Sequence, residues 1–224
     1  MATLQLQMSE NLFVRDPQET ELGRKIIHHG IKLIDELGIE GFNFKRLAES
    51  IDSTEASVYR YFENKHKLLV YLIAWYWNWL EYSLDFHTQN LQNPKEKLKI
   101  AIRLVTEKKE RDPFFPTIDE EALQRIVINE SDKTYLTKQV DEDNKIGSFR
   151  GIKSLCAKIA DIIMEINPQY IYPHALVSTV LQASQQQVFF AEHLPSLTSF
   201  SFRENEHYEA NADFLYNLII KAVS

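Results

Sequence analysis

Apolar residues recur along most of this chain at the three- and four-residue spacing that is typical of amphipathic α-helices. Between Phe42 and Leu69 the pattern divides into two very short helical segments and the start of a long one. Asn43 is placed to cap a helix that ends near Ile51, and the Thr54 hydroxyl is placed to cap the next helix. No alternating run typical of a strand stands out, so the sequence predicts an all-α protein with about nine to ten helices.

The second short segment is only about two turns long, so it is too short to be stable on its own. Steps of about 100° per residue place Val58 and Phe62 on its inner side. Its outer side and flanks then carry small, phenolic and charged side chains: Glu55, Ala56, Ser57, Tyr59, Arg60 and Tyr61. A short helix that rests on another and offers such groups suits the major groove of DNA, so the spacing predicts a helix-turn-helix.

These residues resemble the DNA-binding domain of the TetR family of bacterial transcriptional regulators. The resemblance runs from about residue 26 to residue 69, and its most specific part is the phrase VYRYF at 58–62 with Lys65 after it. Two positions depart from the family, which usually has glycine at Asp52 and often a basic residue at Glu55. Aspartate tolerates a left-handed turn better than most residues, so we expect the turn to be kept.

The resemblance implies a DNA-binding head and a helical body that binds an effector and forms a dimer. We expect a flexible arm over residues 1–15, a helix-turn-helix head over 16–70 and the body over 71–224. Ser57 and Arg60 are expected to touch bases, whereas Lys65 is expected to hold a phosphate. The full set expected to contact DNA is Thr20, Asn43, Lys45, Thr54, Glu55, Ala56, Ser57, Tyr59, Arg60, Tyr61 and Lys65.

Charge is absent from the twenty-six residues 166–191, which contain no Asp, Glu, Lys or Arg. A charge-depleted helix belongs either to a core or to the centre of a subunit interface, and the residues leave both open. In the TetR family the last two helices of each subunit form a four-helix dimer interface. The resemblance therefore implies a homodimer on a palindromic operator, with an interface made by Leu176, Val180, Leu181, Phe214 and Leu218.

Aromatic side chains in the body exceed what a small bundle needs for packing, although we expect most of them in the core. The resemblance implies that the body encloses a pocket for a small effector. An aromatic lining favours a hydrophobic or aromatic organic molecule. The candidate lining residues are Trp75, Trp79, Phe86, Phe115, Tyr135, Phe149, Gln182, Gln186 and Phe189.

Capping residues and prolines predict where the other helices begin and end. Asp16, followed by proline and glutamate, predicts the start of the first helix, and a capping box predicts a helix that begins at Thr117. One continuous helix is expected from about residue 141 to residue 166. Pro173 is expected to start the next helix, which runs to about His193.

The formal charge is −7, and residues 1–70 hold nine lysines and arginines against eleven acidic residues. Net charge therefore gives no support to DNA binding, so only the placement of the charges can. The alternative function is a small-molecule-binding or protein-interaction module whose DNA affinity is weak or lost. The operator, the target genes, the effector, and whether the protein represses or activates, do not follow from the sequence.

Composition limits the chemistry that we expect. The single cysteine, Cys156, and the absence of a secretion signal favour a cytoplasmic protein, and the apolar run 68–80 is too short to span a membrane. His28 and His29 are adjacent and point in different directions, so no metal site is expected. Tyr61 and Lys65 have the spacing of a short-chain dehydrogenase helix, but the six glycines form no phosphate loop. We expect no enzyme activity and no cofactor.

Overall fold

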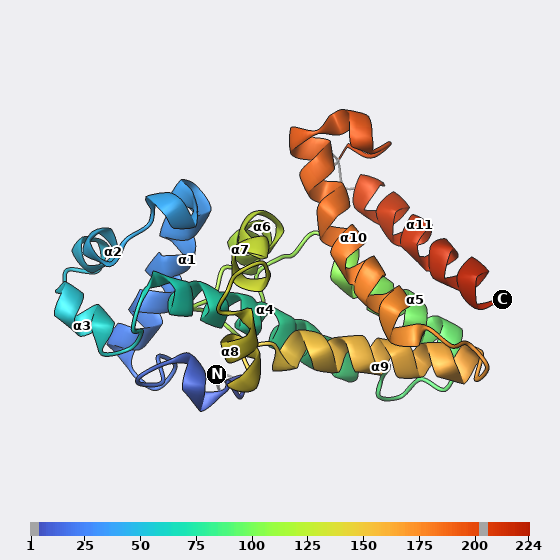
Figure 1. Cartoon of the computed structure of the whole chain (residues 1–224), viewed down its shortest axis with the longest axis horizontal. Helices are drawn as coiled ribbons and strands as arrows, with labels where there is room; N and C mark the ends of the chain where they lie inside the picture. The colour runs from blue at the N-terminus through green and yellow to red at the C-terminus, as the bar shows by residue number, and fades with distance from the viewer. Residues whose placement is uncertain (1–4, 202–205) are drawn as a thin grey trace. The chain divides into compact units, whose positions relative to one another are not determined.

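The computed structural model describes residues 5–201 and 206–224, and those two ranges contain helices and no strand (Figure 1). The all-α fold predicted from the sequence is confirmed. The chain divides into two compact units: unit 1 comprises residues 1–78 and 109–151, and unit 2 comprises 79–108 and 152–224. The functional division into 16–70 and 71–224 stays a prediction.

Unit 1 contains the helices that the sequence assigns to the head, together with three later ones. They are α1 (Glu21–Gly41), α2 (Phe44–Ser50), α3 (Glu55–Tyr59), the first part of α4 (Lys65–Thr88), α6 (Glu120–Glu130), α7 (Asp132–Tyr135) and α8 (Val140–Lys145). Its core is aliphatic and aromatic, with Ile26, Ile34, Phe62 and Leu68 all at most 1% exposed. Helix α1 packs extensively on α6, and α2 packs on α3.

Helix α1 begins later than the sequence predicted. The Thr20 hydroxyl accepts a hydrogen bond from the Gly23 N–H at 3.0 Å, so Thr20 is the cap. The predicted start at Asp16 is wrong, because the Asp16 carboxylate accepts from the Gln18 N–H at 2.8 Å and closes a turn instead. At the other end Gly38 has φ of 65°, a backbone conformation that only glycine adopts easily.

The segment before α1 is packed rather than extended into solvent. Met8 and Leu12 are buried, and Leu12 lies in a short 3₁₀ helix, Glu10–Leu12. The Ser9 hydroxyl donates to the Ile146 carbonyl at 2.7 Å, and the Val14 N–H donates to the Tyr61 carbonyl at 2.8 Å. Residues 8–14 therefore differ from the flexible arm predicted over 1–15, whose residues 1–4 lie outside the described part of the chain.

Unit 2 is a helical bundle formed by the end of α4 and by the helices that follow. They are α5 (Pro94–Thr106), α9 (Arg150–Ile166, its first two residues in unit 1), α10 (Pro173–His193), a 3₁₀ turn at Pro195–Leu197 and α11 (Glu206–Val223). Helix α11 lies against α5 and α10 (Figure 1). The start of α10 at Pro173 and its end at His193 agree with the prediction.

Two predictions for the middle of the chain were wrong. The continuous helix expected over 141–166 is divided into α8 and α9, because Gly147 has φ of 84° and turns the chain between them. Helix α6 is capped by Asp119, whose carboxylate accepts from the Ala122 N–H at 3.0 Å, rather than by Thr117. In both cases the local pattern was helical, but a nearby residue sets the helix end: Gly147 separates α8 from α9, and Asp119 caps α6.

Candidate nucleic-acid interface

The turn between α2 and α3 has the geometry that the sequence predicted. The Asn43 side chain accepts from the Arg46 N–H at 2.9 Å and caps α2. The Thr54 hydroxyl accepts from the Ser57 N–H at 3.3 Å and caps α3. Asp52, where a glycine is usual, has φ of 50°, so the aspartate adopts the left-handed conformation expected of it.

Helix α3 is held by two side chains and exposes the rest. Val58 and Phe62 are both 0% exposed and anchor it to the core of unit 1. Tyr59 is half exposed, and its ring and that of Phe44 meet edge to face with 5.0 Å between centroids. The remaining outer residues are exposed or partly exposed to solvent: Glu55, Ala56, Ser57 and Arg60.

Two cations near α3 are available to a ligand. Lys45 and Arg60 are exposed, and neither has a protein partner among residues 5–201 and 206–224. Arg46, by contrast, donates from Nη1 to the Gly41 carbonyl at 3.0 Å, and Lys25 pairs with a glutamate on its own helix at 3.1 Å. Lys45, Arg60 and the remaining donors of the exposed Arg46 therefore carry the positive charge of this surface.

Lys65 lies differently from the prediction. Its Nζ donates to the Ile39 carbonyl at 2.8 Å and approaches the Phe42 carbonyl at 3.5 Å. The ammonium group thus satisfies carbonyls at the end of α1 rather than facing solvent. We remove its side chain from the proposed phosphate contacts.

Tyr61 is also directed inward. It is 3% exposed, and its hydroxyl hydrogen-bonds the Thr20 hydroxyl at 2.7 Å. Arg15 lies over the ring, with 5.8 Å from its guanidinium carbon to the centroid. Tyr61 therefore joins α3 to the start of α1 and leaves the proposed DNA contacts, whereas the partly exposed Thr20 remains among them.

An ion cluster fixes the N-terminal turn of α4. Asp143 on α8, 1% exposed, accepts from Lys67 Nζ at 2.6 Å and from His66 Nε2 at 3.0 Å. Burial disfavours the charged form of Asp143, but the hydrogen bonds from Lys67 and His66 outweigh it and lower the pKa of its carboxyl group. The cluster joins α4 to α8 inside unit 1, and it occupies two basic side chains close to α3.

The predicted effector pocket is distributed over both units. In unit 1, Trp75 and Phe115 line a cavity of about 320 Å³ and meet edge to face, with 5.2 Å between ring centroids. Tyr135 and Phe149, also in unit 1, pack on each other at 5.3 Å. The remaining candidates belong to unit 2: Trp79, Phe86, Gln182, Gln186 and Phe189.

Within unit 2 the candidates are not equivalent. Trp79 is buried, Gln186 and Phe189 are partly exposed and Gln182 is exposed. Phe86 is 58% exposed and stacks on Tyr82, so we remove it from the proposed pocket. The sequence missed Tyr71 and Arg24, which line the unit 1 cavity, because the pattern gave Tyr71 only a packing role.

The residues expected at a dimer interface separate into two groups. Phe214 and Leu218 on α11 are 47% and 41% exposed, and Leu176 on α10 is partly exposed. Val180 and Leu181 are buried at 1% and 3%, within the single chain. These two belong to the core of unit 2, which was the other reading of the charge-free segment, and we remove them from the proposed interface.

In residues 5–201 and 206–224, no group of three or more His, Cys, Asp or Glu is arranged to hold a metal ion. None of the described helices combines the length and hydropathy that a membrane crossing requires.

Residues 26–72 match the family model of the bacterial regulatory proteins of the tetR family. This match confirms the resemblance found in the head. No curated protein matches the chain.

Several solved structures share the fold at low sequence identity. The crystal structure of AibR in complex with isovaleryl coenzyme A and operator DNA is 18% identical, with a TM-score of 0.57 over 87% of this chain and 97% of that one. The fatty acid degradation regulator FadR from Bacillus halodurans is 15% identical, with a TM-score of 0.62 over 88% and 93%. FadR from Bacillus subtilis in complex with stearoyl-CoA is 12% identical, with a TM-score of 0.59 over 89% and 98%.

Proposed function

We propose that this protein, whose head matches the tetR family, is a ligand-responsive transcriptional regulator that binds a palindromic operator as a homodimer. In this proposal it acts as a repressor, and a small hydrophobic or aromatic effector releases it from DNA. The observation that carries the proposal is the exposed outer face of α3, anchored from behind by Val58 and Phe62. A helix fixed in this way presents its free side chains to the major groove without a cost of ordering the helix backbone first.

Base and phosphate contacts are assigned from exposure. Arg60 reads a base edge, because a free guanidinium forms two hydrogen bonds to guanine. Ser57 and Glu55 are the other polar groups on this face, and glutamate accepts from the amino group of cytosine. Ala56 permits close approach of the backbone. The phosphate contacts come from Lys45 and from the neutral polar groups at the helix starts and on the flank: Thr20, Asn43, Thr54 and Tyr59.

A homodimer would form through α10 and α11. Phe214 and Leu218 lie one turn apart on α11, and both side chains are about half exposed in the single chain. Large apolar side chains clustered on one helix face are typical of a subunit interface. The two-fold symmetry of such a dimer would present two α3 helices to the two halves of a palindrome.

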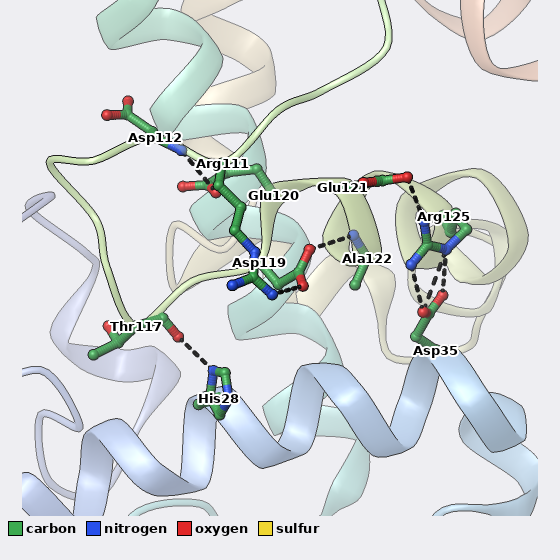
Figure 2. Close-up of polar contacts among 10 residues, drawn as sticks. All are labelled: His28, Asp35, Arg111, Asp112, Thr117, Asp119, Glu120, Glu121, Ala122 and Arg125. Atoms are coloured by element: carbon green, nitrogen blue, oxygen red, sulfur yellow. Dashed lines mark hydrogen bonds and ion pairs between the residues drawn. The ribbon is translucent and has the colours of Figure 1, made fainter.

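The path from effector to DNA is proposed to pass through α6 and α1. Arg125 on α6 donates to the Asp35 carboxylate on α1 from Nε at 3.0 Å and from Nη2 at 2.8 Å (Figure 2). The Glu130 carboxylate accepts from the Ile39 N–H at 3.3 Å, at the point where α1 ends. Because α1 supports α2 and α3, a displacement of α6 would move the recognition helix with it.

The effector is proposed from chemistry and from relatives in fold. AibR was crystallised with isovaleryl coenzyme A and FadR of B. subtilis with stearoyl-CoA, so two similar folds hold molecules with an apolar acyl part. Aromatic side chains such as Trp75 and Phe115 suit the same kind of group here. By linkage, an effector that lowers operator affinity must bind less tightly to the DNA-bound protein by the same factor.

Selection of bound sequences from random duplex DNA tests the function directly. A palindrome with half-sites about one DNA turn apart is expected, since two α3 helices of one dimer would read successive major grooves. The alternative, a module without DNA affinity, predicts that the selection enriches nothing and that duplex DNA does not retain the protein at low salt. That result would overturn the proposed regulator.

Two substitutions then test the assignment of contacts. Arg60→Ala should weaken the selected site by about 1–3 kcal/mol and relax the base preference at one position. Lys45→Ala should weaken all sequences alike and reduce the salt slope by about 1 per head, or about 2 for the dimer. Binding titrations at several salt concentrations separate the two effects. Identical base preferences and salt slopes in both variants and the wild type would contradict the assignment.

A further inference from the structure

A cavity of about 320 Å³ lies in unit 1 and is lined both by residues of the head and by residues 71–118. Helix α1 contributes Arg24 and Ile27, α4 contributes Tyr71 and Trp75, and the turn before α6 contributes Phe115. The N-terminal segment lies beside it, since the side chain of residue Gln18 lines the cavity and donates to the Leu6 carbonyl at 3.0 Å. The volume is at the lower end of the range for small-molecule pockets, which is about 300–1,000 Å³.

The Tyr71 hydroxyl is the most unusual group in the lining. The side chain is 1% exposed, and within the described residues its oxygen has no hydrogen-bond partner. Burial, reinforced by the negative charge of Asp16, raises the pKa of Tyr71, so the group stays an O–H donor at any physiological pH. Buried hydroxyl groups are nearly always hydrogen-bonded in native proteins. An acceptor for this donor is therefore missing from the described part of the chain.

Arg24 gives the cavity its charge. It is the only charged residue in the described lining, and its Nη1 donates to the Gln18 carbonyl at 2.8 Å. A guanidinium carries five N–H donors in a fixed fork, so this bond leaves others to bind a second acceptor. Asp16, whose negative charge acts on Tyr71, accepts from the Gln18 N–H at 2.8 Å.

The walls between these polar groups are apolar. Trp75 and Phe115 meet edge to face at 5.2 Å, and Ile27 completes the surface on the α1 side. Walls of this kind accept an aromatic ring or a compact aliphatic group, whereas Tyr71 and Arg24 both donate hydrogen bonds. An occupant complementary to this surface has an apolar body and a negatively charged acceptor.

We propose that this cavity is the effector site and that it binds a small organic carboxylate with an apolar body of one or two rings. The carboxylate accepts from Tyr71 Oη and from the Arg24 guanidinium, and the body lies against Trp75 and Phe115. The occupant thereby joins α1 to α4. Its effect on DNA rests on the proposed function, but its binding does not.

Binding of defined probes tests the site. The probes are 2-naphthoate and phenylacetate, with 2-naphthamide as the uncharged analogue of the first, and calorimetry and tryptophan fluorescence provide the readouts. Saturable binding of at least one carboxylate is expected, with the amide at least tenfold weaker, because the amide cannot pair with the Arg24 charge. Absence of saturable binding by both carboxylates, or equal binding of the amide, would overturn the proposal.

Matched variants locate the binding. Tyr71→Phe keeps the ring and removes the donor, so it should weaken the carboxylate about tenfold, and Arg24→Gln should weaken it at least as much. Tyr76→Phe, at another fully buried tyrosine outside the lining, and Lys25→Gln, at the next cation of α1, are the controls. Circular dichroism verifies that every variant is folded. Equal losses in the test and control variants would overturn the assignment of the site.

The link to DNA is tested separately. Addition of the carboxylate to the wild-type protein on its selected operator should lower DNA affinity, and Tyr71→Phe should require about tenfold more ligand for the same release. If the carboxylate binds with the expected variant pattern but DNA affinity does not change, the site stands and its role as the effector site is refuted. If the protein has no operator, the binding experiment still decides the site.

Discussion

Glu120 is a carboxylic acid that the fold keeps out of water, and its replacement by glutamine should change how stability depends on pH. The side chain is 0% exposed at the first residue of α6. Its Oε2 accepts from the Asp112 N–H at 3.1 Å (Figure 2), whereas Oε1 has no partner in the described residues. Burial raises the pKa of Glu120 to about 7, and the charges of Asp112 and Asp119 add to it. The backbone N–H groups of Glu120 and Asp112 oppose the rise.

The sign of the effect follows from the two pKa values. The unfolded chain has the ordinary value of 4.5, so between 4.5 and about 7 the unfolded state releases a proton that the folded state keeps. The stabilising contribution of protonated Glu120 is therefore complete below pH 4.5 and is lost as pH rises towards 7. At ~1.4 kcal/mol per pKa unit the complete loss is about 3 kcal/mol. About 2.5 kcal/mol of it falls between pH 5 and pH 8.

Urea unfolding of the wild type and Glu120→Gln at pH 5, 6, 7 and 8 measures this quantity. The protein concentration is kept constant, because the stability of a dimer depends on it. The free energy of unfolding of Glu120→Gln, relative to that of the wild type, should rise by about 2.5 kcal/mol from pH 5 to pH 8, since glutamine stays neutral throughout. The wild type and the variant share every other group that titrates in this range, so the contributions of those groups cancel in the difference between the two free energies of unfolding.

Glu121→Gln is the matched control for this experiment. Its carboxylate is 44% exposed and pairs with Arg125 at 3.3 Å, so its removal should change stability by less than about 1 kcal/mol at every pH. A difference between Glu120→Gln and the wild type that is constant from pH 5 to pH 8 would refute the reasoning. It would mean that Glu120 is ionised in the folded protein despite its burial.

Two further predictions concern the head and the dimer. Lys65→Ala should lower the free energy of unfolding by about 1–3 kcal/mol, because the Ile39 carbonyl loses a charged donor at 2.8 Å. Lys45→Ala, at an exposed cation, should change the free energy of unfolding by no more than about 0.5 kcal/mol. Equal urea midpoints for Lys65→Ala and Lys45→Ala would contradict the structural role assigned to Lys65. Leu218→Asp should dissociate the proposed dimer in sedimentation experiments, whereas the exposed Asn217→Asp should not. Sedimentation of Leu218→Asp as a stable dimer would move the interface away from this face of α11.

Local features of the fold were predictable because each depends on a few neighbouring residues. Asn43 and Thr54 were assigned as caps from residue type alone, and both accept the expected backbone N–H. Val58 and Phe62 were placed inside by helical spacing, and both are completely buried. Pro173 began a helix as expected, because proline lacks the N–H that the first turn cannot use.

Features that depend on distant parts of the chain were not predictable in this way. Tyr61 was placed outside by continuing the spacing of α3, but α3 ends at Tyr59 and the chain then turns inward. Lys65 was assigned to phosphate from its position at a helix start, but the Ile39 carbonyl, twenty-six residues earlier, holds its ammonium group. The sequence could not tell whether Val180 lies in the core or at a subunit interface, and the structure buries it within the single chain.

The small number of free cations changes what should hold this protein on DNA. Of the described cations near α3, Lys45 is assigned to a phosphate and Arg60 to a base, so we expect a salt slope of about −1 per head and −2 per dimer. Non-specific attraction of that size is weak, and Glu55 reduces it further. In this proposal affinity comes mainly from base contacts made by two heads at once, so we expect both Arg60 and the dimer to be needed for full affinity. In this proposal DNA binding depends on the geometry of the two heads more than on charge, so we expect a displacement of α1 to weaken it.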